Sequence, residues 1–493
     1  MEKSIIIIGA GIAGLSAGCY AQMNGYRTQI FEMHAKPGGL CTGWQRKGYT
    51  FDGCMHHLAG SGPTSELYRV WEELGAAQGR EIIYDEAFAQ IEDADGKAFT
   101  VYVDPDRLEA HLKALSPADA AVIEAYADGV RRFSRFEFFS LLTAKPCEMV
   151  SMLPHVPTLV KWGRVTLEQY ALRFSDPFLR RAFPWMQYGF ADVPAMANLA
   201  FLAGCHNRQL GWPVGGSLLF AQAIADRYVA LGGELHYRSR AERILVGDDR
   251  AVGVRLADGT EHRADLVISA ADGHATIFDM LGGKYVNDKI RRFFEAVPES
   301  QVMSAQVSLG VARDLSHEPH MLTLLLPEPM QVIDRAFERL DVEIFGPHTG
   351  LAPEGKTTIK VPLEASYAYW KGLRADRARY DEAKEQLAET VIEQLERRFP
   401  GLKAQIEVVD VATPVTVERF TGNYHGYQAW GVPDAGFIGI MQGLCKTLPG
   451  LENFYMVGQW ARASVGVSTV AGAARKLIEA LCKRGGERFV TVV

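Results

Sequence analysis

Three glycines near the start of the chain have the spacing that a bound phosphate group requires. Gly9, Gly11 and Gly14 form the pattern GxGxxG. In such a turn the first glycine permits a tight bend, the second lets the backbone approach a phosphate, and the third lets a helix pack closely on the preceding strand. A carboxylate, Glu32, follows 18 positions after Gly14, where it can accept hydrogen bonds from ribose hydroxyls. These residue types and spacings predict a site for an adenine dinucleotide.

A second group of reactive side chains, Cys54, His56 and His57, follows further along the chain. A histidine titrates near neutral pH and suits a proton shuttle, whereas a cysteine suits nucleophilic attack or a covalent link. If these residues are extended, Cys54 and His56 share one face while Met55 and His57 share the other, so one pair would face a bound group. The alternative is that both histidines are hydrogen-bonded packing residues.

The elements around the glycines form a complete βαβ pattern. Residues 5–8 are isoleucines, a run too short for a helix and typical of a buried parallel strand. The glycine turn opens a helix whose N-terminus supplies N–H groups and a positive dipole end for phosphates. Residues 28–31 resume a strand pattern that Glu32 closes. A lone GxGxxG is a weak signal, and this context is what makes the prediction specific.

The composition limits the partners. With 493 residues, of which 48% are hydrophobic, the chain suggests two domains with sizeable cores. A net charge of −7 argues against nucleic acid. No apolar run is long enough to span a membrane, so any membrane contact would be peripheral. The seven cysteines include no CxxC pair, which suits a reducing cytoplasm, and we expect no metal site.

We expect two domains that interleave along the chain. A dinucleotide-binding domain is predicted from residues 1–62, 208–275 and 441–493, and a substrate domain from residues 63–207, mostly helical, and 276–440. A Pro/Gly turn at 212–217 opens a helix that Gly232 and Gly233 end, and strand-like pieces follow as far as residue 269. The last block again reads as strand, glycine, helix.

Segments spread over nearly the whole chain resemble one family, the FAD-dependent phytoene desaturases, carotenoid isomerases and retinol saturases, which are distant relatives of the amine oxidases. The resemblance implies an α/β fold: a glutathione reductase-like, FAD-binding Rossmann-type domain with an interleaved α+β substrate domain. The matching segments are GAGIAG at 9–14 with Glu32, PGG at 37–39, WPVGGS at 212–217, AERI at 241–244, GV at 253–254, LADG at 256–259, ERFTG at 418–422 continuing to Gly426 and Gly431, VG at 457–458 and VGVS at 465–468.

The resemblance also implies which residues hold an extended FAD. The glycine turn and the end of the second strand would meet the pyrophosphate and the adenosine ribose, through Gly9, Gly11, Ile12, Ala13, Gly14, Glu32 and Met33. The loop Gly38, Gly39 and Leu40 would line the phosphate and ribityl region, and Ala241 would offer backbone to the adenine. Near the C-terminus, Gly458 and Gln459 would lie at the pyrophosphate, and Gly466, Val467 and Ser468 at the flavin.

Three departures from the family pattern matter. Gln459 stands where relatives usually carry an acidic residue, and Leu40 where a basic residue is common. Both changes weaken the polar contacts to FAD. The family's FDxGP appears here as residues 51–55, FDGCM, followed by two histidines, so the chemistry beside the flavin can differ from carotenoid desaturation.

The sequence therefore predicts an FAD-dependent oxidoreductase that desaturates, saturates or isomerises carbon–carbon double bonds of an apolar, isoprenoid or polyene-like small molecule. Hydride would pass between a substrate carbon and flavin N5, and His56, His57 or water would move a proton. Two alternatives stay open: an amine or porphyrinogen-type flavin oxidase that uses oxygen, and a flavin-binding protein without catalysis.

We expect a cytoplasmic protein. The stretch 133–162 mixes Phe, Leu, Met and Pro with basic residues, which is compatible with a peripheral membrane surface and equally with helices buried in the substrate domain.

Overall fold

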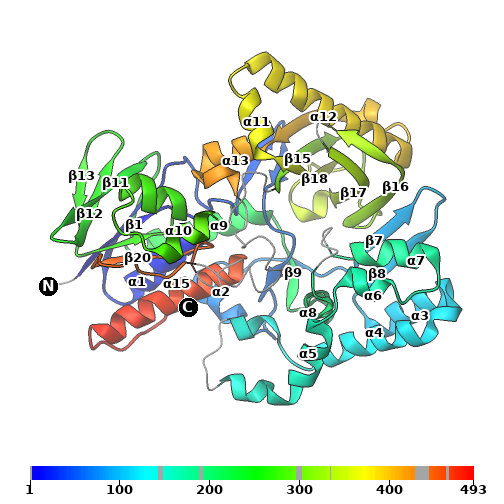
Figure 1. The fold of residues 1–493 in the computed structure, drawn as a ribbon, viewed down its shortest axis with the longest axis horizontal. Helices are drawn as coiled ribbons and strands as arrows, with labels where there is room; N and C mark the ends of the chain where they lie inside the picture. Colours follow the sequence, from blue (N-terminus) through cyan, green and yellow to red (C-terminus); the bar gives the residue numbers. More distant parts are fainter. Residues whose placement is uncertain are drawn as a thin grey trace.

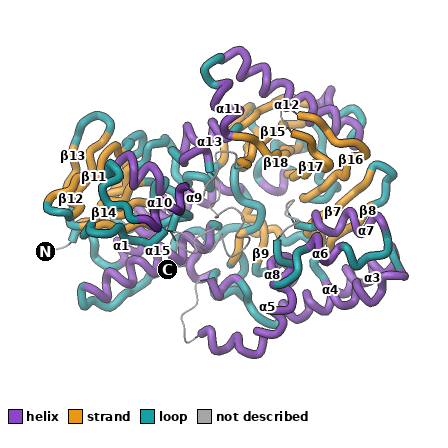
Figure 2. Tube along the Cα trace, in the orientation of Figure 1, coloured by secondary structure: helices purple, strands orange, loops and turns teal. Residues whose placement is uncertain are grey.

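The structure is a computed structural model, and it describes residues 3–142, 148–187, 193–295, 302–332, 335–427, 444–461 and 466–493. Figure 1 shows a lobe on the left that holds both ends of the chain, and on the right a large sheet above a group of helices. Figure 2 shows the same division, with strands gathered in the left lobe and at the upper right and helices at the lower right.

A parallel sheet forms the centre of the left lobe. Its strand order is β10-β2-β1-β14-β20, and every neighbouring pair is parallel. The strands are β1 (Ser4–Ile8), β2 (Arg27–Phe31), β10 (Glu234–His236), β14 (Leu266–Ser269) and β20 (Phe454–Met456). Because they run the same way, their carboxyl ends meet at one edge, where ligands of open α/β sheets bind.

Both faces of the parallel sheet are covered, which explains the all-isoleucine strand. Ile5 and Ile7 pack with helices α1 (Ile12–Met23), α9 (Gly216–Ala230) and α15 (Val467–Arg484). Ile6 and Ile8 belong to the cluster that contains the small antiparallel sheet of β11 (Ala241–Gly247), β12 (Arg250–Leu256) and β13 (Glu261–Arg263). The four side chains are only 0–3% exposed.

A mixed sheet forms the upper part of the right lobe, in the order β19-β15-β18-β17-β16-β7-β8. Its strands are β7 (Ala87–Asp93), β8 (Ala98–Tyr102), β15 (Val302–Val311), β16 (Met321–Val332), β17 (Arg335–Phe345), β18 (Thr357–Ser366) and β19 (Ile406–Ala412). Helices α10 (Asp288–Glu295), α11 (Tyr367–Leu373), α12 (Arg377–Arg398) and α13 (Pro414–Thr421) belong to the same stretch of chain. Leu387, Val391 and Leu395 of α12 share a core with Val307 of β15 and Val361 of β18.

Short helices fill the lower right of Figure 1 around an aromatic core that includes Phe99, Tyr126 and Phe183. They are α3 (Pro105–Leu115), α4 (Ala120–Phe133), α5 (Val156–Gly163), α6 (Leu167–Ala171), α7 (Pro177–Ala182) and α8 (Ala195–His206). Helix α2 (Tyr68–Glu73) and the short strands β3 (Gly43–Arg46), β4 (Tyr49–Asp52), β5 (Leu58–Ala59), β6 (Ile82–Ile83) and β9 (Leu210–Pro213) occupy the remaining parts of the first half of the chain.

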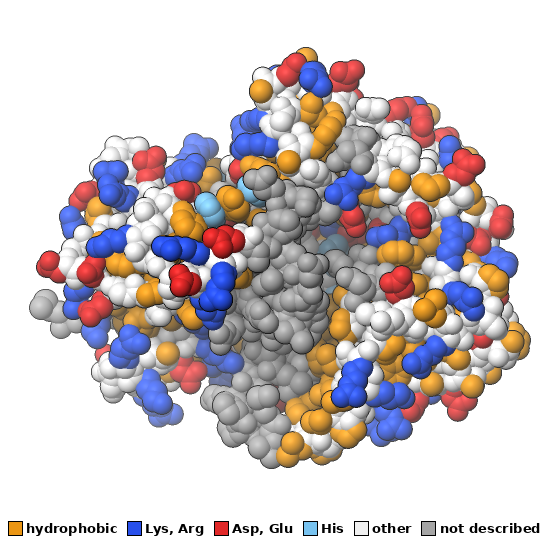
Figure 3. Space-filling model, in the orientation of Figure 1, with side chains coloured by type: hydrophobic (Ala, Val, Ile, Leu, Met, Phe, Trp, Pro, Cys, Tyr) orange, Lys and Arg blue, Asp and Glu red, His pale blue; other side chains and the backbone are white. Residues whose placement is uncertain are grey.

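The stretch 133–162 divides between buried and exposed side chains. Phe133 and Trp162 are buried, whereas Leu153, Val156 and Val160 are exposed. Figure 3 shows hydrophobic side chains mixed with basic ones along the lower edge of the right lobe. Within the described ranges, no helix combines the length and the apolarity needed to cross a bilayer. Membrane contact through the exposed residues stays a prediction.

The predicted α/β fold class with a Rossmann-type domain is confirmed. Residues 1–62, 208–275 and 441–493 each contribute strands to the parallel sheet, while residues 63–207 and 276–440 share the mixed sheet. One feature differs from the mostly helical pattern expected of residues 63–207. Their strands β7 and β8 extend the mixed sheet, because β7 pairs in parallel with β16 from far along the chain.

Candidate active site

Two glycine-rich turns meet at the carboxyl edge of the parallel sheet. Gly9 has a φ of +96° and Gly38 a φ of +110°, in the region that favours glycine. The N–H of Gly38 donates to the carbonyl of Ala10 over 2.8 Å, and Gly38 pairs with Gly11 as an isolated bridge. A β-carbon on Gly39 would approach the α-carbon of Gly11 to 3.3 Å. Position 39 therefore leaves little room for a side chain next to Gly11.

Gly11 and Gly14 have different roles. A β-carbon on Gly14 would lie 2.0 Å from the carbonyl oxygen of Gly9, so α1 needs glycine there to pack on the turn. Gly11 has an ordinary φ of −68°, and the nearest atom to a β-carbon on it is the Gly38 oxygen at 3.8 Å. The packing of the protein does not require glycine at position 11. Its missing side chain leaves a cradle at the N-terminus of α1, where the helix offers N–H groups to a phosphate.

Glu32 closes β2 beside this turn. Its side chain is buried, with Oε2 accepting the N–H of Ala10 and Oε1 accepting the N–H of His34, each over 2.7 Å. Burial raises the pKa of Glu32 against the lowering effect of these hydrogen bonds. A carboxylate has about four acceptor positions, so this one keeps capacity for ribose hydroxyls.

We expect Glu32→Gln to lower dinucleotide affinity by about tenfold to hundredfold, because a hydrogen bond to a charged acceptor contributes ~1.5–3 kcal/mol. The stripped protein should melt at a lower temperature, because the amide nitrogen of a glutamine would face the N–H of Ala10 or of His34, which the second carboxylate oxygen now accepts. Calorimetric titration of stripped protein measures the affinity. Glu234→Gln, at an exposed acid on the neighbouring β10, is the matched control. Wild-type affinity in Glu32→Gln would mean that this carboxylate does not contact the ribose.

Met33 and Ala241 lie on either side of Glu32. The carbonyl of Glu32 accepts the N–H of Ser239 over 2.8 Å, which brings the end of β2 next to the buried Ala241 that starts β11. The sulfur of the half-buried Met33 lies 3.2 Å from where a β-carbon on Gly422 would stand. The predicted adenosine residues are thus neighbours, and the loop that ends at Gly422 adjoins them.

The C-terminal block contributes to the same edge. Gly458 follows β20 with a φ of +120°, and a β-carbon on it would lie 3.7 Å from that of Ala13 in the first turn of α1. Gly466, with a φ of +93°, caps α15, and the hydroxyl of Ser468 in its first turn donates to the carbonyl of Ala59 over 2.9 Å. The remaining predicted residues lie beside these: Ile12 is buried in α1, Gln459 is half-buried after Gly458, and Val467 starts α15. Gly431 and Val465 of the family segments lie outside the described residues.

Residues 54–57 form a loop between β4 and β5, and not an extended strand. Oδ1 of the buried Asp52 accepts the N–H groups of Cys54 and Met55 over 2.9 and 3.0 Å, which turns the chain. The same carboxylate accepts the N–H and the hydroxyl of Ser217, in the first turn of α9, over 2.6 and 2.8 Å. The extended strand on which the expected alternation of faces depends is therefore absent from residues 54–57.

This loop places His56 on a buried ion pair of the mixed sheet. Nδ1 of His56 lies 3.2 Å from Oε2 of Glu343, and Nζ of Lys360 lies 2.9 Å from Oε1 of the same carboxylate. The Lys360–Glu343 contact is an ion pair, and the His56–Glu343 contact becomes one when the imidazole is protonated. The angles of both contacts fall outside those of an ideal hydrogen bond. Burial acts to raise the pKa of Glu343, but the charges of His56 and Lys360 outweigh it and hold that pKa well below its usual range. Glu343 is therefore ionised.

His57 has a different environment. Its ring stacks on Phe88 with the centroids 5.2 Å apart. Burial, together with His320 and His56, lowers the pKa of His57 to about 3. His57 is therefore neutral at physiological pH and cannot hold a proton as imidazolium, so His56 is the better placed of the two to move one.

Cys54 lies beside a second thiol, Cys41. Cys41 is buried, and its contact with Cys54 together with burial raises the pKa of Cys41 well above its usual value. Both cysteines are reduced. A thiol with a raised pKa is a poor nucleophile, so Cys41 serves packing.

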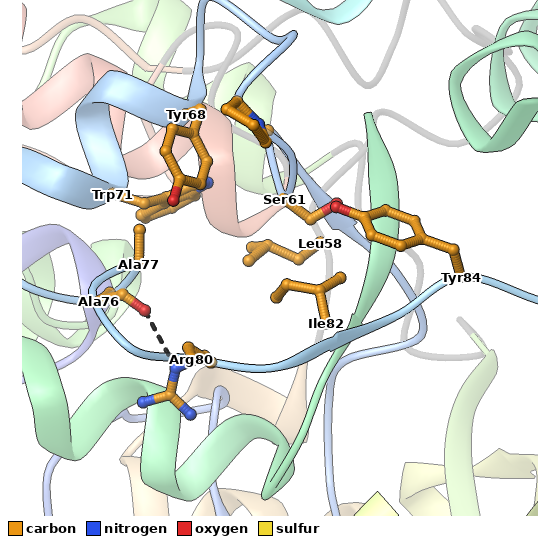
Figure 4. A pocket seen from close by; sticks show the side chains of 11 residues that line it. Leu58, Ser61, Tyr68, Trp71, Ala76, Ala77, Arg80, Ile82 and Tyr84 are labelled. Atoms are coloured by element: carbon orange, nitrogen blue, oxygen red, sulfur yellow. Dashed lines mark hydrogen bonds between the residues drawn. The ribbon is translucent and has the colours of Figure 1, made fainter. Parts of the chain in front are cut away.

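A pocket of about 210 Å³ opens where β5, α2 and β6 approach one another. Figure 4 shows Leu58, Trp71 and Ile82 forming an apolar wall. The guanidinium of Arg80 donates hydrogen bonds to the backbone carbonyls of Ala76, Val214 and Leu219. Arg80 therefore links these segments of the chain. Polar groups of Ser61, Tyr68 and Tyr84 also line the pocket. It is smaller than the ~300–1,000 Å³ of typical small-molecule sites, so it suits only a part of a ligand.

Residues 7–74 match the family described as NAD(P)-binding Rossmann-like domain. The chain is 25% identical to the chloroplastic prolycopene isomerase of Arabidopsis thaliana, over 94% of this chain and 80% of that protein. It is also 25% identical to a lycopene-forming phytoene desaturase of a Paracoccus species, over 96% of each. The chain is a homologue of these enzymes.

The homology confirms the resemblance that the sequence motifs predict, and it makes the protein an enzyme of the oxidoreductase class. A solved structure, an oxidoreductase from Methanosarcina mazei, shares the fold with a TM-score of 0.63 at 21% identity, over 97% of this chain and 100% of that one. The Rossmann-like match implies a dinucleotide or flavin cofactor. In open α/β sheets such ligands bind at the carboxyl edge.

Two residues near the reactive loop, Glu343 and Lys360, belong to none of the sequence motifs. Glu343 and Lys360 each stand between two apolar residues in a strand-like run, Val342 to Ile344 and Ile359 to Val361. A charged residue inside an apolar strand is the only hint in the sequence that these two positions are unusual. The alternation of apolar and polar residues along a strand predicts that the charged side chain faces solvent. Only the pairing of β17 with β18, which sets Glu343 opposite Lys360, and the approach of the loop at His56 bury these charges.

Proposed function

We propose that the protein binds FAD and changes carbon–carbon double bonds in an apolar, polyene-like small molecule by desaturation, saturation or isomerisation. One observation carries the proposal. The loop with Cys54 and His56 runs into Ala59, whose carbonyl accepts the hydroxyl of Ser468 at the start of α15, while Glu32 stands at the other end of the glycine turns. The reactive loop therefore adjoins the end at which the family resemblance puts a flavin ring.

The residues fit an extended FAD. Glu32 and Ala241 would hold the adenosine, and the cradle at Gly11 together with Gly458 would take the pyrophosphate. The N-terminus of α15, capped by Gly466 without a side-chain hydrogen bond, would stabilise negative charge at the ring. When bound, a flavin supplies a reversible acceptor and donor of hydride.

The chain supplies a proton carrier and an apolar wall. Nδ1 of His56 lies against Glu343, yet 35% of the side chain is accessible, so His56 can exchange a proton with a molecule beside it. The apolar side chains of Leu58 and Trp71 in the pocket would contact an apolar part of a substrate. The relatives whose names mention lycopene, prolycopene and phytoene support this substrate class.

The test begins with the ligand of the purified protein. We expect extraction to yield FAD, and an isoprenoid polyene to reduce or reoxidise that flavin in the absence of oxygen, as followed at its visible absorbance. Oxygen consumption with an amine but not with a polyene would favour the oxidase alternative. A flavin that no donor reduces would favour a role without catalysis.

We expect His56→Gln to slow the reaction about 100-fold, because a positioned acid or base contributes roughly 10²–10⁴ in rate. Cys54→Ala should stay within about threefold of the wild type, since a hydride transfer needs no nucleophile from the protein. Turnover and flavin content are measured together, so that loss of cofactor is not mistaken for loss of chemistry. Unchanged rates in His56→Gln would mean that the reacting centre lies elsewhere.

A cytoplasmic location and a peripheral membrane contact remain part of the proposal. Leu153, Val156 and Val160, with Lys161 next to them, are the exposed residues through which an apolar substrate could be drawn from a lipid surface.

A further inference from the structure

Three ionisable side chains form a line from the interior of the mixed sheet to the reactive loop. Lys360 on β18 and Glu343 on β17 stand directly opposite each other on adjacent strands. Their side chains are 5% and 1% exposed. The second oxygen of Glu343 lies against Nδ1 of His56. Each oxygen of this carboxylate therefore has its own nitrogen partner, one from the sheet and one from the loop.

The arrangement is costly for a sheet that needs only to fold. Removing charges from water costs free energy, and apolar residues of similar size usually fill such positions equally well. The charges of Lys360 and Glu343 stabilise each other. Burial acts to lower the pKa of Lys360, but the charge of Glu343 raises that pKa above its usual value. Stability of the fold therefore does not explain why a charged carboxylate lies buried next to His56.

The geometry of His56 supplies that reason. Nδ1 is shielded from solvent, whereas 35% of the side chain is accessible. The two ring nitrogens of an imidazole point in different directions, so with Nδ1 directed at Glu343, Nε2 points away from that carboxylate. A carboxylate 3.2 Å away attracts an N–H and repels a nitrogen lone pair, so it favours the tautomer that carries its proton on Nδ1. Nε2 then has a lone pair.

We infer that Glu343 is a positioning residue: it holds His56 with the proton on Nδ1 and stabilises the imidazolium, so that Nε2 accepts and returns the proton of the substrate. Lys360 keeps Glu343 ionised and in place. The inference rests on the proposed function for its substrate. In a desaturation, a carbon–hydrogen bond breaks, its electron pair forms the new double bond, and its proton joins Nε2. The hydride from the neighbouring carbon would need an acceptor, which a flavin would supply when bound, and His56 would later give the proton to water.

The test reads the tautomer directly. In the holoenzyme labelled with ¹⁵N-histidine, His56→Gln identifies the His56 signals, and long-range ¹H–¹⁵N correlations report which nitrogen carries the proton. We expect the wild type to carry it on Nδ1. In Glu343→Leu/Lys360→Met, which removes both buried charges and so keeps the sheet apolar, the signal should shift toward the Nε2–H form. The same variant should lose kcat about 100-fold while KM changes less than about threefold.

Glu343→Gln is the second variant, because it keeps size and an acceptor but not the charge, and it should lose kcat less than the double variant. The exposed pair Lys371–Glu418 provides the control Glu418→Gln, which should leave the His56 signals unchanged. An unaltered tautomer, or an unaltered kcat, in the double variant would overturn the inference. If no polyene reacts with the wild type, the proposed function fails, and the tautomer shift alone would still establish that Glu343 sets His56.

Discussion

A protein with Gly11→Ala is expected to fold like the wild type and to lose flavin on purification. A β-carbon at this position meets only one neighbour within 4 Å, the Gly38 oxygen at 3.8 Å, and the φ of −68° suits alanine. The added methyl therefore fills the cradle and not the protein core. Because crowding a close contact costs ~1–3 kcal/mol, we expect flavin affinity to fall about tenfold to hundredfold.

Gly14→Ala is the matched contrast, since its β-carbon would lie 2.0 Å from the carbonyl oxygen of Gly9. That clash forces α1 away from β1, so the stripped protein itself should melt at a lower temperature. Gly372→Ala, in α11 with no atom within 4 Å of the new carbon, should leave both stability and flavin content unchanged or slightly raised. Flavin-to-protein absorbance ratios and thermal melts separate these effects. Full flavin content in Gly11→Ala would place the pyrophosphate elsewhere.

A protein with Lys360→Met is expected to lose about 3–5 kcal/mol of stability, because the substitution leaves the buried Glu343 charge without its cation. Lys360 lies 2.9 Å from that carboxylate and is 5% exposed. His56, at 3.2 Å on the other oxygen, compensates the charge only when it is protonated. Removing both charges in Glu343→Leu/Lys360→Met should restore most of the loss, since an apolar pair of similar size fits the sheet.

Chemical denaturation of stripped protein measures the free energy of unfolding in each variant. Lys371→Met breaks an exposed pair with Glu418, at 2.7 Å, and should cost less than about 1 kcal/mol because water screens it. An equally small loss in Lys360→Met would show that water reaches Glu343 and that the pair is not buried in solution.

Local sequence predicts the first part of the cofactor site well. The isoleucines of β1, the turn at Gly9 to Gly14 and the acid at Glu32 occupy neighbouring positions, and each has a role set by short-range sterics or hydrogen bonding. The late strand and helix, β20 and α15, are also visible as a local pattern. Their place beside β14 and α1 follows once the fold class is known.

The reactive loop shows where local reasoning fails. Alternation along residues 54–57 predicts two faces, but Asp52 bonds to two N–H groups ahead of it and to Ser217 far along the chain, and these hydrogen bonds bend the loop. The difference between His56 and His57 depends on what each touches. One meets the carboxylate of Glu343 and the other is enclosed next to Phe88 and His320.

The sequence by itself thus determined a Rossmann-type domain, its glycine turns and the acid at the end of the second strand, because those features need only neighbours in the chain. Tertiary structure alone decided that Glu343 and Lys360 are buried and that they pair on adjacent strands. It also decided that His56 contacts the second oxygen of Glu343. The free energy of a buried charge depends on its partners and on the exclusion of water, and both are supplied by segments that meet only when the lobes have formed.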